Sequence, residues 1–299
     1  RDLISLNHIA KDEHAGKIKK FEKYLNKKIS QYKIYKRDYY VNLTKSLKIC
    51  SSPIHSHSFV GQLILSNKIS KKGCRAIFGG EGADELFGGY ETYKQNINNY
   101  KINNSNYTKI LKPEIFSYKN SEFDYFNETM NSKWKDCFKK YSFIKNKDER
   151  YRLSMMFMDS TIQLTSNGLR GCDLMSMYHS VESRSAFLRK DIVKFALNLP
   201  LKFKINLKKN DLMSTKILLK KTFLKYFPPN LVLKKQGFAG FPNEMEIFLG
   251  DKDKYLVKDI FKIKDFKKKI KKADRATTWK LINTEMFLRK ALKTSKMIP

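Results

Sequence analysis

Residues 74–90 read CRAIFGGEGADELFGGY, and this stretch decides how the rest of the chain is interpreted. The apolar run Cys74–Phe78 has the length of a buried strand and follows a Lys-Lys-Gly breaker. Gly79, Gly80 and Gly82 come directly after it, where glycine permits positive backbone dihedral angles and lets main-chain N–H groups approach a ligand. The pattern predicts a strand, a glycine turn and a helix, which is the arrangement of nucleotide sites at strand ends.

Three carboxylates, those of Glu81, Asp84 and Glu85, crowd into five positions at the same strand end. Such a cluster repels itself, and partial desolvation adds to the cost unless a cation lies close by. We therefore expect a cationic partner here, and magnesium, a substrate ammonium group or a lysine would each serve. The alternative is a simple turn whose acidic residues are favoured by the N-terminus of the following helix.

The string from Gly79 to Tyr90 closely resembles the signature of the asparagine synthetase family, which reads S-G-E-G-[AS]-D-E-L-F-G-G-Y. Three further stretches resemble motifs of that family in the same order along the chain. They are L-R-G-C-D-L-M-S-M-Y-H-S-V-E-S-R at 169–184, K-K-Q-G-F at 234–238, and the Trp-containing helix at 279–289. The resemblance therefore extends over most of the chain, and we expect the last of these stretches to serve packing.

The resemblance implies an α/β fold, with a parallel sheet flanked by helices as in a synthetase domain of the adenine nucleotide alpha hydrolase type, and extra C-terminal helices. No repeat and no Gly/Ser or Pro linker divides the sequence, so we expect one domain over 1–299. In the family, a phosphate-binding S-G-G-x-D-S loop and a glutaminase domain come earlier in the chain. Neither is present, and we expect that the chain is truncated before Arg1.

The resemblance also implies ATP-dependent amidation of aspartate to asparagine through a β-aspartyl-AMP intermediate, with ammonia from glutamine and with ATP and Mg²⁺ as cofactors. Glu81 is expected to orient ammonia or accept its proton, and Lys235 to stabilise the departing pyrophosphate. Gly79 and Gly80, together with Glu81, are assigned to nucleotide binding. Asp84 is assigned to the substrate ammonium group or to magnesium.

Asp173, Glu182 and Arg184 are assigned to substrate binding within the second matching stretch. An arginine offers a fork of donors that fits a substrate carboxylate. Glu182 and Arg184 would serve equally well in structural ion pairs, and both interpretations stay open at this point.

The chain departs from the family pattern at several positions. Gly79 stands where the family usually has serine, Leu174 replaces an arginine, and Ser185-Ala186 with Arg189 replace parts of a V-P-F-L-D pattern. These departures concern the substrate more than the fold, because relatives amidate or cyclise other carboxylates in antibiotic and surface-polysaccharide pathways. An amidotransferase acting on another carboxylate is thus the first alternative, and a non-catalytic basic binding module is the second.

The chain is strongly basic, with 61 Lys and Arg against 29 Asp and Glu, which gives a formal charge of +32. The charge is mostly lysine spread along the whole chain, whereas nucleic-acid readers favour arginine gathered on one face. Four widely spaced cysteines form no metal or disulfide framework, and His55-x-His57 lacks a third ligand. We expect a cytoplasmic protein with small-molecule substrates and without nucleic-acid or membrane partners, while homo-oligomer formation stays open.

The hydrophobic periodicity completes the sequence-based expectations. It predicts irregular surface structure with short helices over 95–150, and a helix capped by Asp211 over 211–226. The other predicted helices cover 17–29, 58–70, 192–199 and 276–292.

Overall fold

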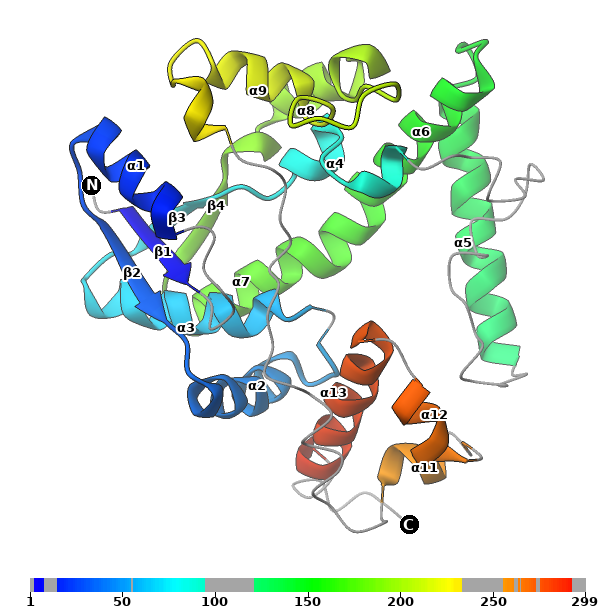
Figure 1. Cartoon of the computed structure of the whole chain (residues 1–299). Coiled ribbons are helices and arrows are strands. Elements are labelled where there is room, and N and C mark those ends of the chain that lie inside the picture. Colours follow the sequence, from blue (N-terminus) through cyan, green and yellow to red (C-terminus); the bar gives the residue numbers. More distant parts are fainter. Residues whose placement is uncertain are drawn as a thin grey trace. The chain divides into compact units, whose positions relative to one another are not determined.

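The structure is a computed structural model that describes residues 3–7, 15–54, 56–94, 121–232, 255–260, 263, 265–272 and 275–291. The chain divides into two compact units, which are described one at a time. Unit 1 comprises 1–77, 170–183 and 236–299, and unit 2 comprises 78–169 and 184–235. The described part is a mostly helical α/β structure with short strands (Figure 1). The single domain over 1–299 stays a prediction.

Unit 1 begins with a small parallel sheet. Strand β1 (Leu3–Asn7) pairs with β2 (Ile29–Lys33) in parallel register, and helix α1 (Ala15–Leu25) connects the two strands (Figure 1). Parallel neighbours need such a crossover helix. The predicted helix over 17–29 is therefore too long, because Asn26 adopts a left-handed backbone (φ 49°) that ends the helix before β2 starts. Neither strand was predicted from the sequence.

The core of unit 1 lies between helices. Helix α2 (Lys36–Cys50) buries Tyr39, Leu43, Leu47 and Cys50, whose spacing places them on one face. They form one apolar cluster with residues of α3 (Ser58–Lys71), α7 (Arg170–Met177) and α13 (Arg275–Ala291). The short helices α11 (Leu256–Ile260) and α12 (Phe266–Lys272) complete the unit. The helix predicted over 58–70 is confirmed as α3.

The C-terminal helix α13 also confirms its prediction and its packing role. Trp279 and Ile282 are buried, and the Asn283 side chain hydrogen-bonds both main-chain groups of Ile54. The buried Glu285 carboxylate accepts hydrogen bonds from the main-chain N–H groups of Leu256 and Val257, at 3.2 and 2.8 Å. This carboxylate thereby caps the start of α11.

The described part of unit 2 is helical around three apolar clusters. Its elements in chain order are α4 (Ala83–Phe87), η1 (Glu91–Lys94), α5 (Ser121–Lys140), α6 (Lys147–Met158), the π-helical η4 (Asp159–Leu169), η5 (Ala186–Leu188), α8 (Lys190–Leu197), η6 (Leu201–Phe203), α9 (Ile217–Phe223) and η7 (Pro229–Leu231).

Strands β3 (Ala76–Gly79) and β4 (Glu182–Ser185) form a second two-stranded sheet, and the division between the units falls within both strands. The predicted strand is thus present, but it is not buried, since the Phe78 side chain is 79% exposed. The residues of β3 alternate between exposed and half-buried, as expected for a strand with one covered face. Within the described residues, the parallel pairing expected for the sheet is given by β1 and β2, and the adenine nucleotide alpha hydrolase fold stays a prediction.

One prediction of irregular structure and two helix predictions have different outcomes in unit 2. The irregular structure expected over 95–150 is wrong for 121–140, which form the single helix α5, while 95–120 lie outside the described residues. Helix α8 confirms the helix expected before Pro200, although Phe195 on its expected core face is 55% exposed. The helix expected over 211–226 begins only at Ile217.

Candidate functional site

The glycine turn after β3 uses its glycines for different purposes. Only Gly82 has the positive φ (86°) that favours glycine, and it directly precedes α4. A β-carbon on Gly82 would also overlap Cδ2 of Leu188. Gly79 and Gly80 do not use the positive dihedral angles that glycine permits, because in this turn only Gly82 has a positive φ.

Glu81 lies in this turn with its side chain half-buried. Its carboxylate lies over the backbone of Gly79, since a β-carbon placed there would overlap Oε2 and lie 2.8 Å from Cδ. The Ser185 hydroxyl, at the end of β4, donates to the same Oε2 at 3.5 Å. The Glu81 carboxylate is therefore placed between the ends of two neighbouring strands.

Asp84, in the first turn of α4, forms an ion pair with Lys216. Lys216 Nζ lies 2.9 Å from Asp84 Oδ1, and about a fifth of each side chain is exposed. The contact is an ion pair rather than a well-directed hydrogen bond. Gly89 makes room for it, because a β-carbon there would overlap both Asp84 Oδ1 and Lys216 Cε. The cationic partner expected for this cluster is, at Asp84, a lysine of the chain itself.

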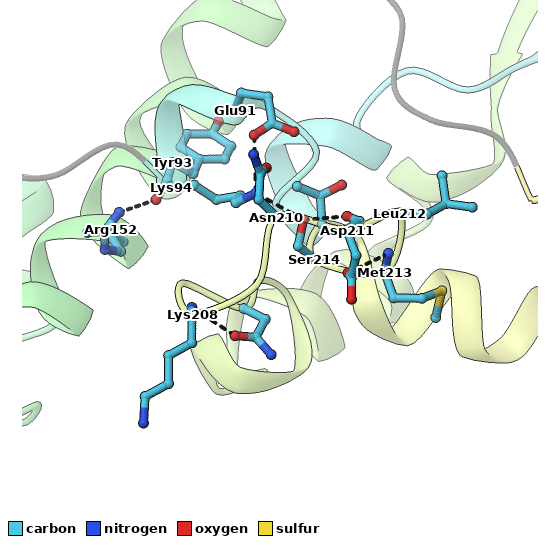
Figure 2. A network of polar contacts seen from close by, with 12 residues as sticks. Glu91, Tyr93, Lys94, Arg152, Lys208, Asn210, Asp211, Leu212, Met213 and Ser214 are labelled. Atoms are coloured by element: carbon cyan, nitrogen blue, oxygen red, sulfur yellow. Dashed lines mark hydrogen bonds and ion pairs between the residues drawn. The ribbon is translucent and has the colours of Figure 1, made fainter.

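Lys216 is brought to Asp84 by the segment that precedes α9. Its own backbone is left-handed (φ 48°), and its N–H donates to the carbonyl of Gly88 at 3.3 Å. Lys94 ties this segment to η1, since its Nζ donates to Asn210 Oδ1 at 3.0 Å and to Ser214 Oγ at 2.9 Å (Figure 2). The hydrogen bond to Gly88 and the hydrogen bonds of Lys94 to Asn210 and Ser214 thus support the left-handed backbone of Lys216.

The third acid of the cluster, Glu85, is buried and accepts a hydrogen bond from the Tyr90 hydroxyl at 2.5 Å. A second pair of the same kind lies nearby, in which the Tyr93 hydroxyl donates to the buried Asp159 at 2.6 Å, and the two tyrosine rings are 5.6 Å apart. Burial and then the carboxylate contacts raise the pKa of both tyrosines. Both hydroxyls therefore remain proton donors at physiological pH.

The three carboxylates thus avoid the repulsion expected from the sequence by turning to different partners: Glu81 to Ser185, Asp84 to Lys216, and Glu85 to Tyr90. Among the described residues, no three His, Cys, Asp or Glu side chains gather closely enough to hold a metal ion. Any metal at Asp84 would need further ligands from a substrate or from water.

The remaining predicted site residues are exposed or undescribed. Asp173 lies on α7 and Glu182 at the start of β4, both in unit 1 and both exposed, while Arg184 of unit 2 is also exposed. The main-chain N–H of Glu182 donates to the carbonyl of Arg75 at 2.8 Å, so the strand fixes its backbone and leaves its side chain accessible. Lys235 lies outside the described residues.

The sequence interpretation missed the partners of the acids. Lys216 carries no local signal in a chain with so much lysine, and its role depends on a contact 132 residues away in sequence from Asp84. Tyr90 belongs to the string that resembles the family signature. Its position five residues after Glu85 places it near the C-terminal end of the short helix α4. Ser185 was noted only as a departure from a family pattern.

A strand followed by a glycine turn and by a carboxylate held at the strand end is an arrangement typical of nucleotide-using α/β enzymes. A sequence model described as asparagine synthase matches residues 10–291, and the chain belongs to this family. A search among curated proteins found no match. Membership makes the protein a ligase-type enzyme that uses ATP, with amidotransferase-type synthetase activity. None of the helices in the described ranges is long and apolar enough to cross a membrane.

Proposed function

We propose that this chain performs the synthetase reaction of a glutamine-dependent asparagine synthetase, in which ATP activates the side-chain carboxylate of aspartate and ammonia converts it to the amide. Activation is needed because a carboxylate resists nucleophiles until one oxygen becomes part of a good leaving group. The observation that carries the proposal is the half-buried Glu81 carboxylate, held beyond the end of β3 beside the glycine turn.

In this proposal, Glu81 accepts a proton from ammonia as the nitrogen attacks the β-aspartyl adenylate. The main chain at Gly79 and Gly80 contacts the nucleotide, as expected for a strand end. Asp173, Glu182 and Arg184, whose side chains are exposed, would hold aspartate. Lys235 would stabilise the negative charge that grows on the departing pyrophosphate.

Asp84 suits Mg²⁺ as a single carboxylate ligand, because this ion commonly takes one or two protein carboxylates and completes its shell with phosphate oxygens and water. The bound ion would supply positive charge to the phosphates of ATP. Lys216 already pairs with this carboxylate, so a bound ion would have to displace the lysine or share Asp84 with it. The substrate ammonium group remains the alternative ligand.

We also propose a source for the ammonia and a cellular compartment for the reaction. Glutamine would supply ammonia through a glutaminase domain in the same protein, and asparagine biosynthesis would take place in the cytoplasm. The substrates are small molecules, and neither nucleic acid nor membrane is a partner. Homo-oligomer formation stays open.

The test is ATP–pyrophosphate exchange measured with a panel of carboxylic acids. Aspartate is expected to support exchange, and amide formation with ammonium or glutamine should follow with the same acid. A panel in which another acid supports exchange and aspartate does not would overturn the aspartate assignment. Such an outcome would favour the amidotransferase of another carboxylate, to which the departures at Gly79 and Ser185 already point.

Lys235 offers a second test with a matched control. Lys235→Ala should lower turnover by about 100-fold with little change in the apparent affinity for ATP, because a group that acts on the departing pyrophosphate matters most in the transition state. The neighbouring Lys234→Ala is the control and should stay close to wild type. Normal exchange in Lys235→Ala would remove this lysine from the proposed reaction.

A further inference from the structure

We infer that Gly79 and Ser185 are positioning residues that together hold the Glu81 carboxylate against the ends of β3 and β4. The inference rests on the proposed function only for the task of Glu81 as a base. The placement itself rests on contacts within unit 2.

The contact with Gly79 fixes one side of the carboxylate. A β-carbon on Gly79 would overlap Oε2 and would lie 2.8 Å from Cδ and 3.1 Å from Oε1 of Glu81. All three carboxylate atoms therefore occupy space that any other residue at 79 would need. The backbone of Gly79 does not need glycine for its dihedral angles, so the close approach of Glu81 is the reason for glycine at this position.

The hydroxyl of Ser185 fixes the other side of the same oxygen. Ser185 is half-buried at the end of β4, and its Oγ lies 3.5 Å from Glu81 Oε2. This distance is longer than the usual range of about 2.5–3.0 Å for an O–H···O hydrogen bond, so the contact is weak, and it limits the movement of the oxygen on this side. Oε2 is thus the atom that both Gly79 and Ser185 locate.

The two positions are also two of those at which the chain departs from the family pattern. A serine at 79 would place a β-carbon in the volume of the Glu81 carboxylate, and a valine at 185 would remove the hydroxyl that reaches it. Both departures therefore act on one group and favour one side-chain conformation of Glu81. Together Gly79 and Ser185 set the direction from which the carboxylate meets its nucleophile.

The effect on Glu81 can be separated from an effect on folding. The atoms that oppose a side chain at 79 are the far end of a flexible side chain, so Gly79→Ala should move Glu81 and leave the backbone in place. In a proton-transfer step, a shift of about 1 Å in a positioned group can change the rate by about 100-fold. Substitutions of Gly79 and Ser185 should therefore change the reaction rate more than the free energy of unfolding.

The first experiment observes Glu81 directly, without activity. The Glu81 ¹³Cδ resonance, assigned by its loss in Glu81→Gln, is measured in the chain with selective glutamate labelling. Gly79→Ala and Ser185→Ala should each shift it clearly. Gly80→Ala is the matched control, because a β-carbon there meets nothing within 4 Å, and it should leave the resonance in place. An unchanged resonance in both test variants, or an equal shift in the control, would overturn the inference.

The second experiment asks whether the position matters for the reaction. Ser185→Ala should lower kcat for amide formation by roughly tenfold relative to the rate of ATP–pyrophosphate exchange, and Ser185→Thr, which keeps the hydroxyl, should restore most of that ratio. Equal loss in both reactions would mean that Ser185 supports the fold only. If the resonance shifts as expected and the ratio does not change, the positioning stands, and the proposed role of Glu81 as the base fails.

Discussion

Two regions of the molecule carry motifs of the same family, and the charged side chains of the two motifs differ in their exposure to solvent. Around α4, Asp84 and Glu85 are enclosed and paired with groups of the chain, Lys216 and Tyr90. In the segment that runs from α7 through β4, Asp173, Glu182 and Arg184 present their side chains to solvent. The comparison teaches that a conspicuous motif combines groups that build the site with groups that remain accessible to a ligand.

The difference has a physical origin. A buried carboxylate needs a partner inside the protein, because leaving it without one costs several kcal/mol. The charge of Asp173 is exposed, and an exposed charge is solvated by water, which a ligand displaces at lower cost. Substitutions in the enclosed region should therefore appear mainly in stability, and those in the open segment mainly in ligand binding.

The largest expected loss of stability in the enclosed region comes from Gly82→Val. The positive φ of Gly82 disfavours a β-branched residue, and the new side chain would also overlap Leu188, so the free energy of unfolding should fall by about 4 kcal/mol. Urea denaturation measures the loss. Gly80→Ala is the control and should change stability by less than about 1 kcal/mol, because Gly80 has open space around it. Equal losses would show that Gly82 has no special role.

The next largest effect on stability is expected at Lys204, a buried lysine of unit 2, where a substitution should raise the free energy of unfolding. Lys204 is 1% exposed, and burial lowers its pKa from the ordinary value of 10.5 to about 8. Between pH 8 and 10.5 Lys204 holds more protons in the unfolded chain than in the native chain, so its contribution to the free energy of unfolding should rise with pH across this window. At pH 7 the buried charge is a net cost of up to about 3 kcal/mol.

Lys204→Met should remove this cost. The variant is expected to be more stable than wild type at pH 7, and the difference should shrink as the pH rises to 10.5, which unfolding curves over that range would measure. Groups that titrate in both proteins cancel in the comparison. A difference that does not depend on pH would contradict the lowered pKa of Lys204.

The Asp84–Lys216 pair should give a smaller effect. Lys216→Met keeps the length of the side chain and the left-handed backbone but leaves Asp84 without its counter-ion, and stability should fall by about 2 kcal/mol, less than for a fully buried pair because both groups are partly exposed. The exposed pair between Arg189 and Asp191 is the matched control. Arg189→Met should cost less than about 0.5 kcal/mol by thermal unfolding.

The smallest effect on stability is expected in the open segment. Asp173→Asn should change the free energy of unfolding by less than about 0.5 kcal/mol, because the side chain is exposed on α7. The same variant should raise the KM for the acceptor acid in the exchange assay. A large loss of stability with an unchanged KM would place Asp173 with the enclosed residues and would remove the contrast between the two regions.

The parts of the fold that could be predicted are those set by local patterns. The repeats of apolar residues in α3, α8 and α13 match the helix period, and each helix was predicted close to its observed bounds. Helix α5 was missed because polar residues dominate its composition, although Trp134, Cys137 and Tyr141 lie at helical spacing along it and at its end. Weighing spacing above composition would have found this helix.

The parts that could not be predicted depend on distant contacts. Asp211 was expected to cap a helix, but its side chain accepts from the N–H of Met213 at 3.0 Å and closes a turn instead. The helix then starts six residues later, at Ile217, after the left-handed Lys216. The left-handed backbone of Lys216 is stabilised by the hydrogen bond to the Gly88 carbonyl and by the ion pair with Asp84. Both partners are distant in sequence, so the local sequence around Lys216 does not predict this conformation.

The ammonium group of Lys216 would compete with any incoming cation for the Asp84 carboxylate. A tethered ammonium group acts at a high effective concentration, so any magnesium ion or substrate amine that uses Asp84 must displace it or share it. If the tethered form were populated 99 times out of 100, the apparent affinity of the incoming cation would fall by about 100-fold. The carboxylate would then accept a cation mainly when ATP brings further ligands with it, which makes loading of the site depend on the order in which substrates arrive.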